Sequence, residues 1–376
     1  MAALQLVLLV AIHSSTAAQA AASLRGVVLD EGGSPVEGAV VSVWLGREPV
    51  AWCRTGPDGR FDIGVEAGSR YMVYVFADDD ATPGVDYLPA RAEAAPDGGE
   101  LRFILAPAAS LVFEGDIQFV ESEELPLSVV YVVLDPASSS AMKVRGFPLE
   151  YGKPGGQSTF IRLDPSHLVV PAGIPFSVLV NCSVLVGAAP IARSFVADEP
   201  GHFTLGRGER AVVDVRRYSL PFNIGVVEER RGAVESRIGE MESVGFYLAA
   251  ERGKITSAVK LISEARYLYD EGRYIESFDA ARKGYIALRH VLADLTGLYD
   301  DAALSVYILI FFLAFSSAAM AFLLSNRDSV KLVGGAAVYA VTLAVLYLTY
   351  PGSVIVPLGR FAASAAIALA SSLTAA

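Results

Sequence analysis

Two long apolar stretches near the C-terminus constrain the fold of this chain more than any other feature. Residues 304–324 and residues 332–350 contain no Asp, Glu, Lys or Arg. A helix needs about 20 consecutive apolar residues to cross the hydrocarbon core of a bilayer. We therefore expect a membrane protein with at least two transmembrane helices.

A third apolar segment, residues 353–375, follows. Pro357 and Arg360 lie near its start, and the rest is rich in Ala and Ser. Three alanines recur at four-residue spacing, which gives a face of small residues that lets helices approach closely: Ala362, Ala366 and Ala370. We expect a helix that packs against protein, either spanning or re-entrant. Arg360 fits an anchor at the membrane interface.

The basic residues between the apolar segments, together with the N-terminal segment, predict how the chain is oriented across the membrane. The short segment 325–331 carries Arg327 and Lys331, and basic loops remain in the cytoplasm. Residues 23–303 would then be extracytoplasmic, with the chain in the cell membrane. Residues 1–22 have an apolar run and a small-residue cleavage pattern at Ala18–Ala20, as in a secretory signal peptide. The alternative is an uncleaved anchor helix.

Residues 24–77 show a two-residue period. The alternating apolar positions are Val27, Leu29, Val41, Val43, Phe61, Ile63, Val65, Val73 and Val75. Turn signals separate these runs at Glu31–Pro35, Gly56–Gly59 and Ala67–Ser69. Alternation of this kind is typical of strands with one buried face, and an Asp-Gly pair between two runs favours a hairpin.

These residues resemble a known family, the carboxypeptidase regulatory-like domain. The resemblance rests on Gly26, Val27, Val28, Asp30, Pro35 to Val41, Thr55, Asp58 to Phe61, Gly68, Tyr71 and Val73. It implies a transthyretin-like β-sandwich over residues 23–107 and an extracytoplasmic location. It does not imply peptidase activity, because such modules are usually non-catalytic.

Residues 108–227 contain further β-rich runs, separated by Pro- and Gly-rich breaks. No helix of useful length fits there, so we expect a second β-sandwich. From residue 228 the apolar period changes to alternating steps of three and four, which predicts helices. Gly253 interrupts this stripe, and Glu271–Arg273 forms a turn.

The helical segment is predicted to span residues 228–302. A heptad-like seam runs from Tyr274 to Leu295, as in coiled coils, and residues 265–288 resemble a single TPR-type hairpin. A hairpin or short three-helix bundle would form a stalk. The overall expectation is a multi-domain membrane protein: two extracytoplasmic β-sandwiches, an α-helical stalk, and transmembrane helices within residues 303–376.

Chemistry-bearing motifs are scarce. The net charge of −11 excludes nucleic acid as a partner. The histidines of the mature chain, His167, His202 and His290, do not match a zinc-peptidase pattern, and neither a nucleophile elbow nor a phosphate-binding loop is present. We expect no catalytic residue and no cofactor, and hence not an enzyme.

Few other residues suggest sites. Asp78, Asp80 and Asp86 lie in an acidic loop that would be either solvated, which is favoured, or a weak Ca²⁺ candidate. Cys53 and Cys182 lack metal-ligand spacing, and whether they form a disulfide is left open. Asn181 begins an Asn-Cys-Ser sequon, a weak glycosylation candidate.

The favoured function is a non-catalytic surface protein for binding, adhesion or assembly. Its partners would be the bilayer, other envelope or membrane proteins, and a second copy bound through the stalk or membrane helices. The hairpin tips at Glu31–Pro35 and Gly56–Gly59 are the first contact sites to consider. One alternative is an accessory or permease-like subunit of an ABC-type transporter. A lesser one is a surface hydrolase with an unrecognised site.

Overall fold

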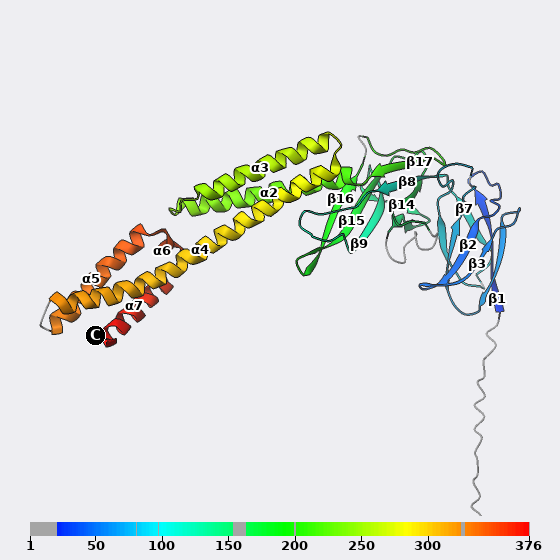
Figure 1. The fold of residues 1–376 in the computed structure, drawn as a ribbon. Coiled ribbons are helices and arrows are strands. Elements are labelled where there is room, and N and C mark those ends of the chain that lie inside the picture. The colour runs from blue at the N-terminus through cyan, green and yellow to red at the C-terminus, as the bar shows by residue number, and fades with distance from the viewer. Residues whose placement is uncertain are drawn as a thin grey trace, which may run out of the picture. The chain divides into compact units, whose positions relative to one another are not determined.

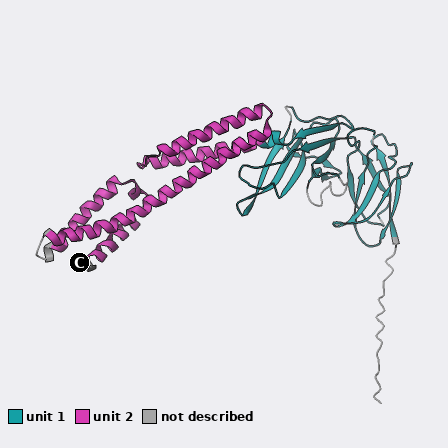
Figure 2. Cartoon of the chain, in the orientation of Figure 1, with its two compact units in different colours: residues 1–219 teal, residues 220–376 magenta. Residues whose placement is uncertain are grey.

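The computed structural model describes residues 21–79, 81–96, 98–152, 163–198, 201–324 and 328–375. Almost all of the predicted signal peptide, residues 1–22, therefore lies outside the described residues. The chain divides into two compact units, residues 1–219 and 220–376 (Figure 2). The described part of the first unit is built from strands, and the second is helical (Figure 1).

Two sheets form the first β-region. One has the order β4-β1-β7, in which β1 is antiparallel to β4 and parallel to β7. Its strands are β1 (Ala21–Asp30), β4 (Arg60–Glu66) and β7 (Leu101–Leu105). The other is antiparallel, with the order β3-β2-β5-β6. Its strands are β2 (Val40–Leu45), β3 (Glu48–Arg54), β5 (Tyr71–Phe76) and β6 (Ala90–Ala94).

One apolar core lies between these two sheets. Every second residue of β4 is buried, which confirms the predicted alternation. Val28 and Phe61 from one sheet and Val41 and Val73 from the other belong to the same buried cluster. The two sheets therefore pack face to face as a sandwich.

A second pair of sheets follows along the chain. The smaller has the order β14-β8-β17, formed by β8 (Ala108–Glu114), β14 (His167–Pro171) and β17 (Arg210–Asp214). The larger has the order β10-β9-β15-β16, with β13 also paired to β9. It comprises β9 (Ser128–Asp135), β10 (Ser140–Ala141), β13 (Glu150–Tyr151), β15 (Ser177–Val186) and β16 (Ala189–Ala197). A small hairpin joins β11 (Lys143–Val144) to β12 (Phe147–Pro148).

The first helix begins earlier than predicted. Strands were expected as far as residue 227, but α2 covers Arg216–Ser243. Buried Leu220, Ile224 and Val227 extend the helical apolar stripe upstream, while Pro221, a residue that disfavours helix interiors, conceals it in the sequence. The predicted interruption at Gly253 is also wrong, because Gly253 lies inside α3 (Ala249–Asp270). The break instead includes Gly245, whose φ is +102°.

The stalk segment contains three helices. The predicted turn after α3 is confirmed, with Gly272 at φ +73°. Helix α4 then runs without interruption over Tyr274–Leu324. The Ser277 hydroxyl of α4 donates to the carbonyl of Ala265 in α3 at 2.7 Å. The last helix of the stalk and the first predicted span are therefore one continuous helix, α4.

Helix α5 (Asp328–Thr349), α6 (Pro351–Ile355) and α7 (Leu358–Ala375) complete the chain. Two helices, Tyr274–Leu323 and Lys331–Thr349, are long and apolar enough to cross a membrane. The third predicted span is divided between α6 and α7, and its apolar part, Leu358–Ser372, is shorter. Of the predicted cytoplasmic loop 325–331, residues 325–327 lie outside the described residues.

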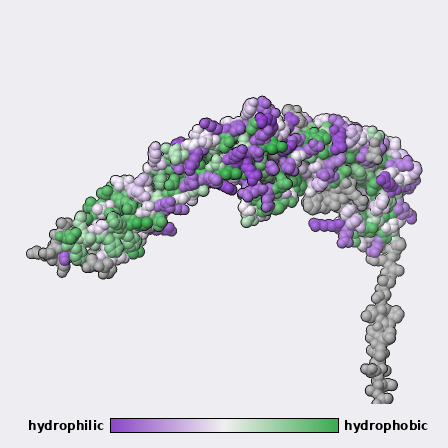
Figure 3. Space-filling model, viewed as in Figure 1, coloured by the Kyte–Doolittle hydropathy of each residue, from purple (hydrophilic) through white to green (hydrophobic). Residues whose placement is uncertain are grey.

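Large apolar side chains cover the outside of these C-terminal helices. Leu304, Phe312 and Leu348 are 58%, 65% and 81% exposed. Figure 3 shows hydrophobic surface gathered over the same helices. Ala362, Ala366 and Ala370 are also exposed, so the predicted small-residue face does not pack within the chain. Inside, the Tyr339 hydroxyl lies 3.3 Å from the Ile310 carbonyl of α4 and 3.2 Å from the Ala365 carbonyl of α7.

Candidate functional site

An aromatic groove lies on the outer face of the sheet β3-β2-β5-β6. It has a volume of about 510 Å³, and its lining includes Trp44, Trp52, Tyr74, Phe76 and Arg54. Register explains this composition. In β2 and β5, Val43 and Val73 are paired and point to the core, so their neighbours Trp44 and Tyr74 lie on the opposite face of the sheet, where Trp44 is half-buried and Tyr74 is buried.

Trp52 dominates this groove. Its side chain is 67% exposed, although large aromatic residues are usually buried. Trp44 is fixed by its indole N–H, which donates to the Ser42 hydroxyl at 3.1 Å. These are the only two tryptophans of the protein. The groove therefore combines a broad aromatic surface with a few polar groups, which is the usual composition of a ligand site.

The hairpin tips predicted as contact sites, Glu31–Pro35 and Gly56–Gly59, lie beside a hydrogen-bonded corner, and residues 31–35 are exposed. Buried Thr55 donates its hydroxyl to the Val36 carbonyl at 2.6 Å and accepts the Ala39 N–H at 2.9 Å. Gly59 has φ +71°, and a Cβ there would clash with the carbonyl of Val28. Thr55 and Gly59 therefore have a structural role, and contact through the exposed tips stays a prediction.

The acidic loop runs from β5 towards the second β-region and is fixed to it by backbone hydrogen bonds. Gly84 N–H donates to the Gly208 carbonyl at 2.9 Å, and Ala108 N–H donates to the Asp86 carbonyl at 2.9 Å. The Val85 N–H donates to the Ser110 hydroxyl, also at 2.9 Å. The loop is thus a structured joint between the two β-regions.

Three carboxylates converge in this joint. One oxygen from each of Asp78, Asp79 and Asp86 lies within 4.8 Å of the other two. Two of them, Asp78 and Asp86, were predicted as weak calcium ligands. The third predicted ligand, Asp80, lies outside the described residues, and neighbouring Asp79 joins the cluster.

The cluster contains a buried charge. Asp78 and Asp79 are exposed, whereas Asp86 is only 2% exposed. Burial, and secondarily the Asp79 carboxylate, raise the pKa of Asp86. Contact with the Asp86 carboxyl, together with the Ala81 N–H, lowers the pKa of Asp79.

A serine–histidine pair lies close by. His167 Nε2 is 2.7 Å from the Ser110 hydroxyl, a separation typical of nucleophile–base pairs. Ser110 is, however, fully buried, and its hydroxyl also accepts the Val85 N–H. Burial lowers the pKa of His167, and Arg210 lowers it further. The pair ties the loop to β14, and a buried serine cannot reach a substrate.

The remaining predicted residues do not come together. Cys53 in β3 and Cys182 in β15 are both free thiols. Burial raises the pKa of Cys182 to about 12, and burial also raises the pKa of Cys53. Asn181 is half-buried within β15, between β9 and β16, and Arg360 is exposed near the start of α7.

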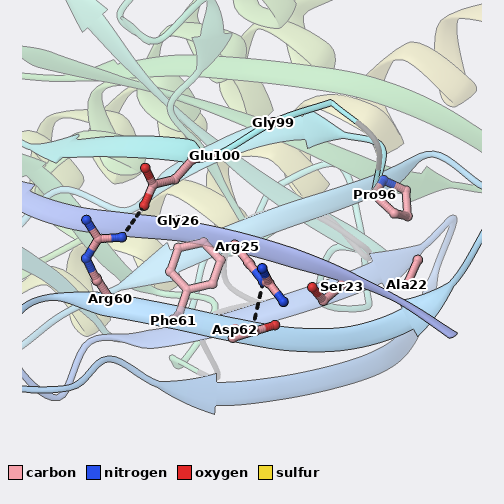
Figure 4. A pocket seen from close by; sticks show the side chains of 10 residues that line it. All are labelled: Ala22, Ser23, Arg25, Gly26, Arg60, Phe61, Asp62, Pro96, Gly99 and Glu100. Carbon is pink, nitrogen blue, oxygen red and sulfur yellow. Dashed lines mark hydrogen bonds and ion pairs between the residues drawn. The ribbon is translucent and has the colours of Figure 1, made fainter.

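Figure 4 shows a separate hollow of about 860 Å³ beside β1 and β4. Arg25 pairs with Asp62 at 2.9 Å, and Arg60 pairs with Glu100 at 2.5 Å. All four side chains are at least half exposed, so these are solvated surface pairs of small energetic value. Phe61 is the one aromatic residue among its lining, whereas four aromatic residues line the groove, so this hollow is a weaker candidate site.

No protein-family model and no curated protein matches this chain. Solved structures give only remote similarity. A Bacillus anthracis TIE protein is 12% identical over 52% of this chain and 33% of its own, with a TM-score of 0.20. A streptococcal ancillary pilin is 9% identical over 52% of this chain and 61% of its own, with a TM-score of 0.17. A putative carbohydrate-binding protein from Bacteroides uniformis is 12% identical over 46% of this chain and 97% of its own, with a TM-score of 0.18.

The chain covers less than two thirds of the length of the first two of these structures. TM-scores of this size carry no information on function. We therefore base the proposals below on the residues of this chain alone.

Proposed function

We propose that this protein is a non-catalytic surface protein, anchored in the cell membrane, that binds a ligand through its first β-sandwich. The observation that carries this proposal is the aromatic groove, where Trp52 is 67% exposed. Trp44 and Phe76 are half-buried beside it and Tyr74 is buried, so Trp52 is the exposed aromatic residue of the groove, and an exposed aromatic side chain in a hollow marks a binding site. The role is adhesion or assembly at the cell envelope.

Membrane anchoring is the second part of the proposal. Helix α4 continues from the stalk into an apolar segment with exposed large side chains, of which Ile308 and Phe312 are 61% and 65% exposed. Such a surface is stable in lipid and unstable in water. In the proposed topology, residues 23–303 are extracytoplasmic and the loop 325–331 is cytoplasmic.

We also propose that residues 23–107 form a carboxypeptidase regulatory-like domain. Two facing sheets and the corner around Thr55 and Gly59 support this assignment. The roles of these residues are structural, which agrees with a module that binds and does not catalyse.

Ligand binding is tested through the two tryptophans. Because both line the groove, any occupant changes their fluorescence. The full-length protein in detergent is titrated with envelope polysaccharides and with purified envelope proteins. We expect saturable quenching or a blue shift that Trp52→Ala weakens at least tenfold. Tyr267→Ala, which removes an exposed aromatic side chain of α3, is the control. Equal binding by the two variants would show that the groove is not the binding site.

Topology is tested with single cysteines in a Cys53→Ser, Cys182→Ser background. A membrane-impermeant maleimide should label Tyr267→Cys on intact cells, since this position is 61% exposed on the stalk. Ser329→Cys, in the predicted cytoplasmic loop, should react only after permeabilisation. The reverse pattern would place the β-regions inside the cell and remove the surface role.

A further inference from the structure

The strongest unexplained feature of the molecule is an orphaned oxygen. Asp86 Oδ2 is buried and accepts no hydrogen bond from any described residue. Its other oxygen, Oδ1, lies 3.1 Å from the Thr82 hydroxyl, but this hydroxyl is also 2.7 Å from the Gly84 carbonyl. A hydroxyl carries a single proton, so Thr82 cannot satisfy both acceptors fully. A buried carboxylate oxygen without a hydrogen-bond donor is costly.

Charges nearby do not neutralise this carboxylate. Asp78, Asp79 and Asp86 form no ion pair within 4.0 Å to a cationic side chain of the described residues. Arg207 influences Asp79, yet its guanidinium stacks on the Tyr87 ring at 4.8 Å. Three like charges held this close repel one another.

We propose that Asp78, Asp79 and Asp86 bind a divalent cation, and that Ca²⁺ is the ion that fits. Calcium is bound by oxygen ligands at about 2.3–2.6 Å, so ligands on opposite sides of the ion are about 4.8 Å apart. The three carboxylate oxygens lie within 4.8 Å of one another. The group contains no His or Cys, which disfavours zinc.

The burial pattern fits this role. Asp86 contributes a buried carboxylate with one unpartnered oxygen to the cluster, while exposed Asp78 and Asp79 leave room for water to complete the coordination shell. Ca²⁺ takes six to eight ligands and tolerates irregular geometry. Mg²⁺ requires a stricter octahedron and releases its water reluctantly, so it should bind more weakly.

The position of the cluster gives the ion a function. Asp78 and Asp79 follow β5 of the first sandwich, whereas the Asp86 backbone accepts the N–H of Ala108, the first residue of β8. A bound ion would link the two ends of this loop directly. It would therefore stiffen the joint between the two β-regions.

The test uses full-length protein in detergent, stripped with EDTA and returned to chelator-free buffer. Calcium chloride is titrated, and heat of binding and Tm are measured, the latter by tryptophan fluorescence. We expect saturable binding and a Tm rise of several degrees at about ten times Kd, because a ligand that binds only the native state stabilises it. Magnesium should give a smaller rise.

Three variants make the result specific. Asp86→Asn and Asp78→Asn should each weaken calcium binding at least tenfold and abolish the Tm rise. Because Asp78 is exposed, Asp78→Asn remains informative if Asp86→Asn does not fold. Glu123→Gln, an exposed carboxylate elsewhere in the first unit, should behave as wild type.

Two outcomes would overturn the proposal. If wild type shows neither heat nor a Tm rise with calcium, a proton shared between Asp79 and Asp86 satisfies the buried oxygen instead. If all variants show the same Tm rise as wild type, the effect is general ionic screening and the cluster is not a site.

Discussion

At the scale of single residues, Gly26 shows how closely the first sandwich is packed. A Cβ at this position would lie 2.5 Å from the Leu101 carbonyl and 2.5 Å from the Phe61 ring, which pairs across the strands with Gly26. We predict that Gly26→Ala destabilises the sandwich by about 2 kcal/mol, a typical cost of overpacking. Chemical denaturation followed by tryptophan fluorescence measures this cost.

Gly64 provides the matched control. It lies in β4 of the same sheet, and a Cβ there meets no atom within 4 Å. Gly64→Ala should be neutral or slightly stabilising, because alanine restricts the unfolded chain. Equal destabilisation by both substitutions would show that the close contacts of Gly26 are not the cause of the lost stability.

His167 gives the first unit a pH dependence. Burial lowers its pKa in the folded state, so the unfolded chain takes up a proton first as the pH falls. Stability should therefore decrease below about pH 6.5, the ordinary pKa of histidine, and be unaffected by this group well above it. His167→Gln should remove this component, seen as a smaller loss of Tm between pH 7 and pH 5. An unchanged pH profile would show that the pKa of His167 does not differ between the folded and unfolded states.

At the scale of elements, regular patterns made the prediction possible. Strand β4 and the turn at Gly272 could both be predicted from the local sequence. A strand alternates its side chains between two faces, and glycine is the residue that most readily adopts the positive φ of such a turn. The start of α2 could not be predicted in this way, because Pro221 disfavours a helix locally. The helix forms there because Leu220 and Ile224 are buried by tertiary packing.

The candidate sites were harder to predict, because they depend on contacts between distant segments. The acidic residues at 78 to 86 are visible in the sequence, but the burial of Asp86 is not, because its loop is fixed by contacts with distant residues such as Ala108 and Gly208. The aromatic groove was missed altogether. Its signal was present in the alternation of β2, where Trp44 falls on the face opposite the core residue Val43.

The crossing of α4 and α5 depends on one glycine. A Cβ at Gly335 would lie 3.1 Å from Ala321 Cβ, so the two helices approach closely at small residues. We predict that Gly335→Leu separates the helices and lowers the Tm of the helical unit in detergent, followed by far-UV circular dichroism. Gly334→Leu is the control, because a Cβ there meets nothing within 4 Å. Glycine is a poorer helix former than leucine, so helix propensity alone would raise the Tm of both variants. Similar losses in both variants would show that the larger side chain is harmful at either position and that the close approach at Gly335 is not the cause.

At the scale of the whole molecule, a β-rich unit and a membrane-competent helical unit are joined in one chain. The first unit is built from described strands whose polar and apolar faces alternate, whereas α4 and α5 expose apolar side chains on their outer surfaces. The two surfaces favour different surroundings. The exposed leucine and phenylalanine side chains of the helices favour lipid, whereas the charged side chains of the strands favour water. The expected site of attachment is therefore the second half of α4.

Truncation tests this attachment. A chain that ends at Asp301 loses the apolar half of α4 and all of α5 to α7, whereas a chain that ends at Leu324 keeps one complete apolar segment. One helix of about 20 apolar residues is enough to span a bilayer. We predict that the longer chain resists extraction from membranes by alkaline carbonate and that the shorter chain is released. Retention of the shorter chain would show a second anchor upstream, as expected if residues 1–22 remain uncleaved.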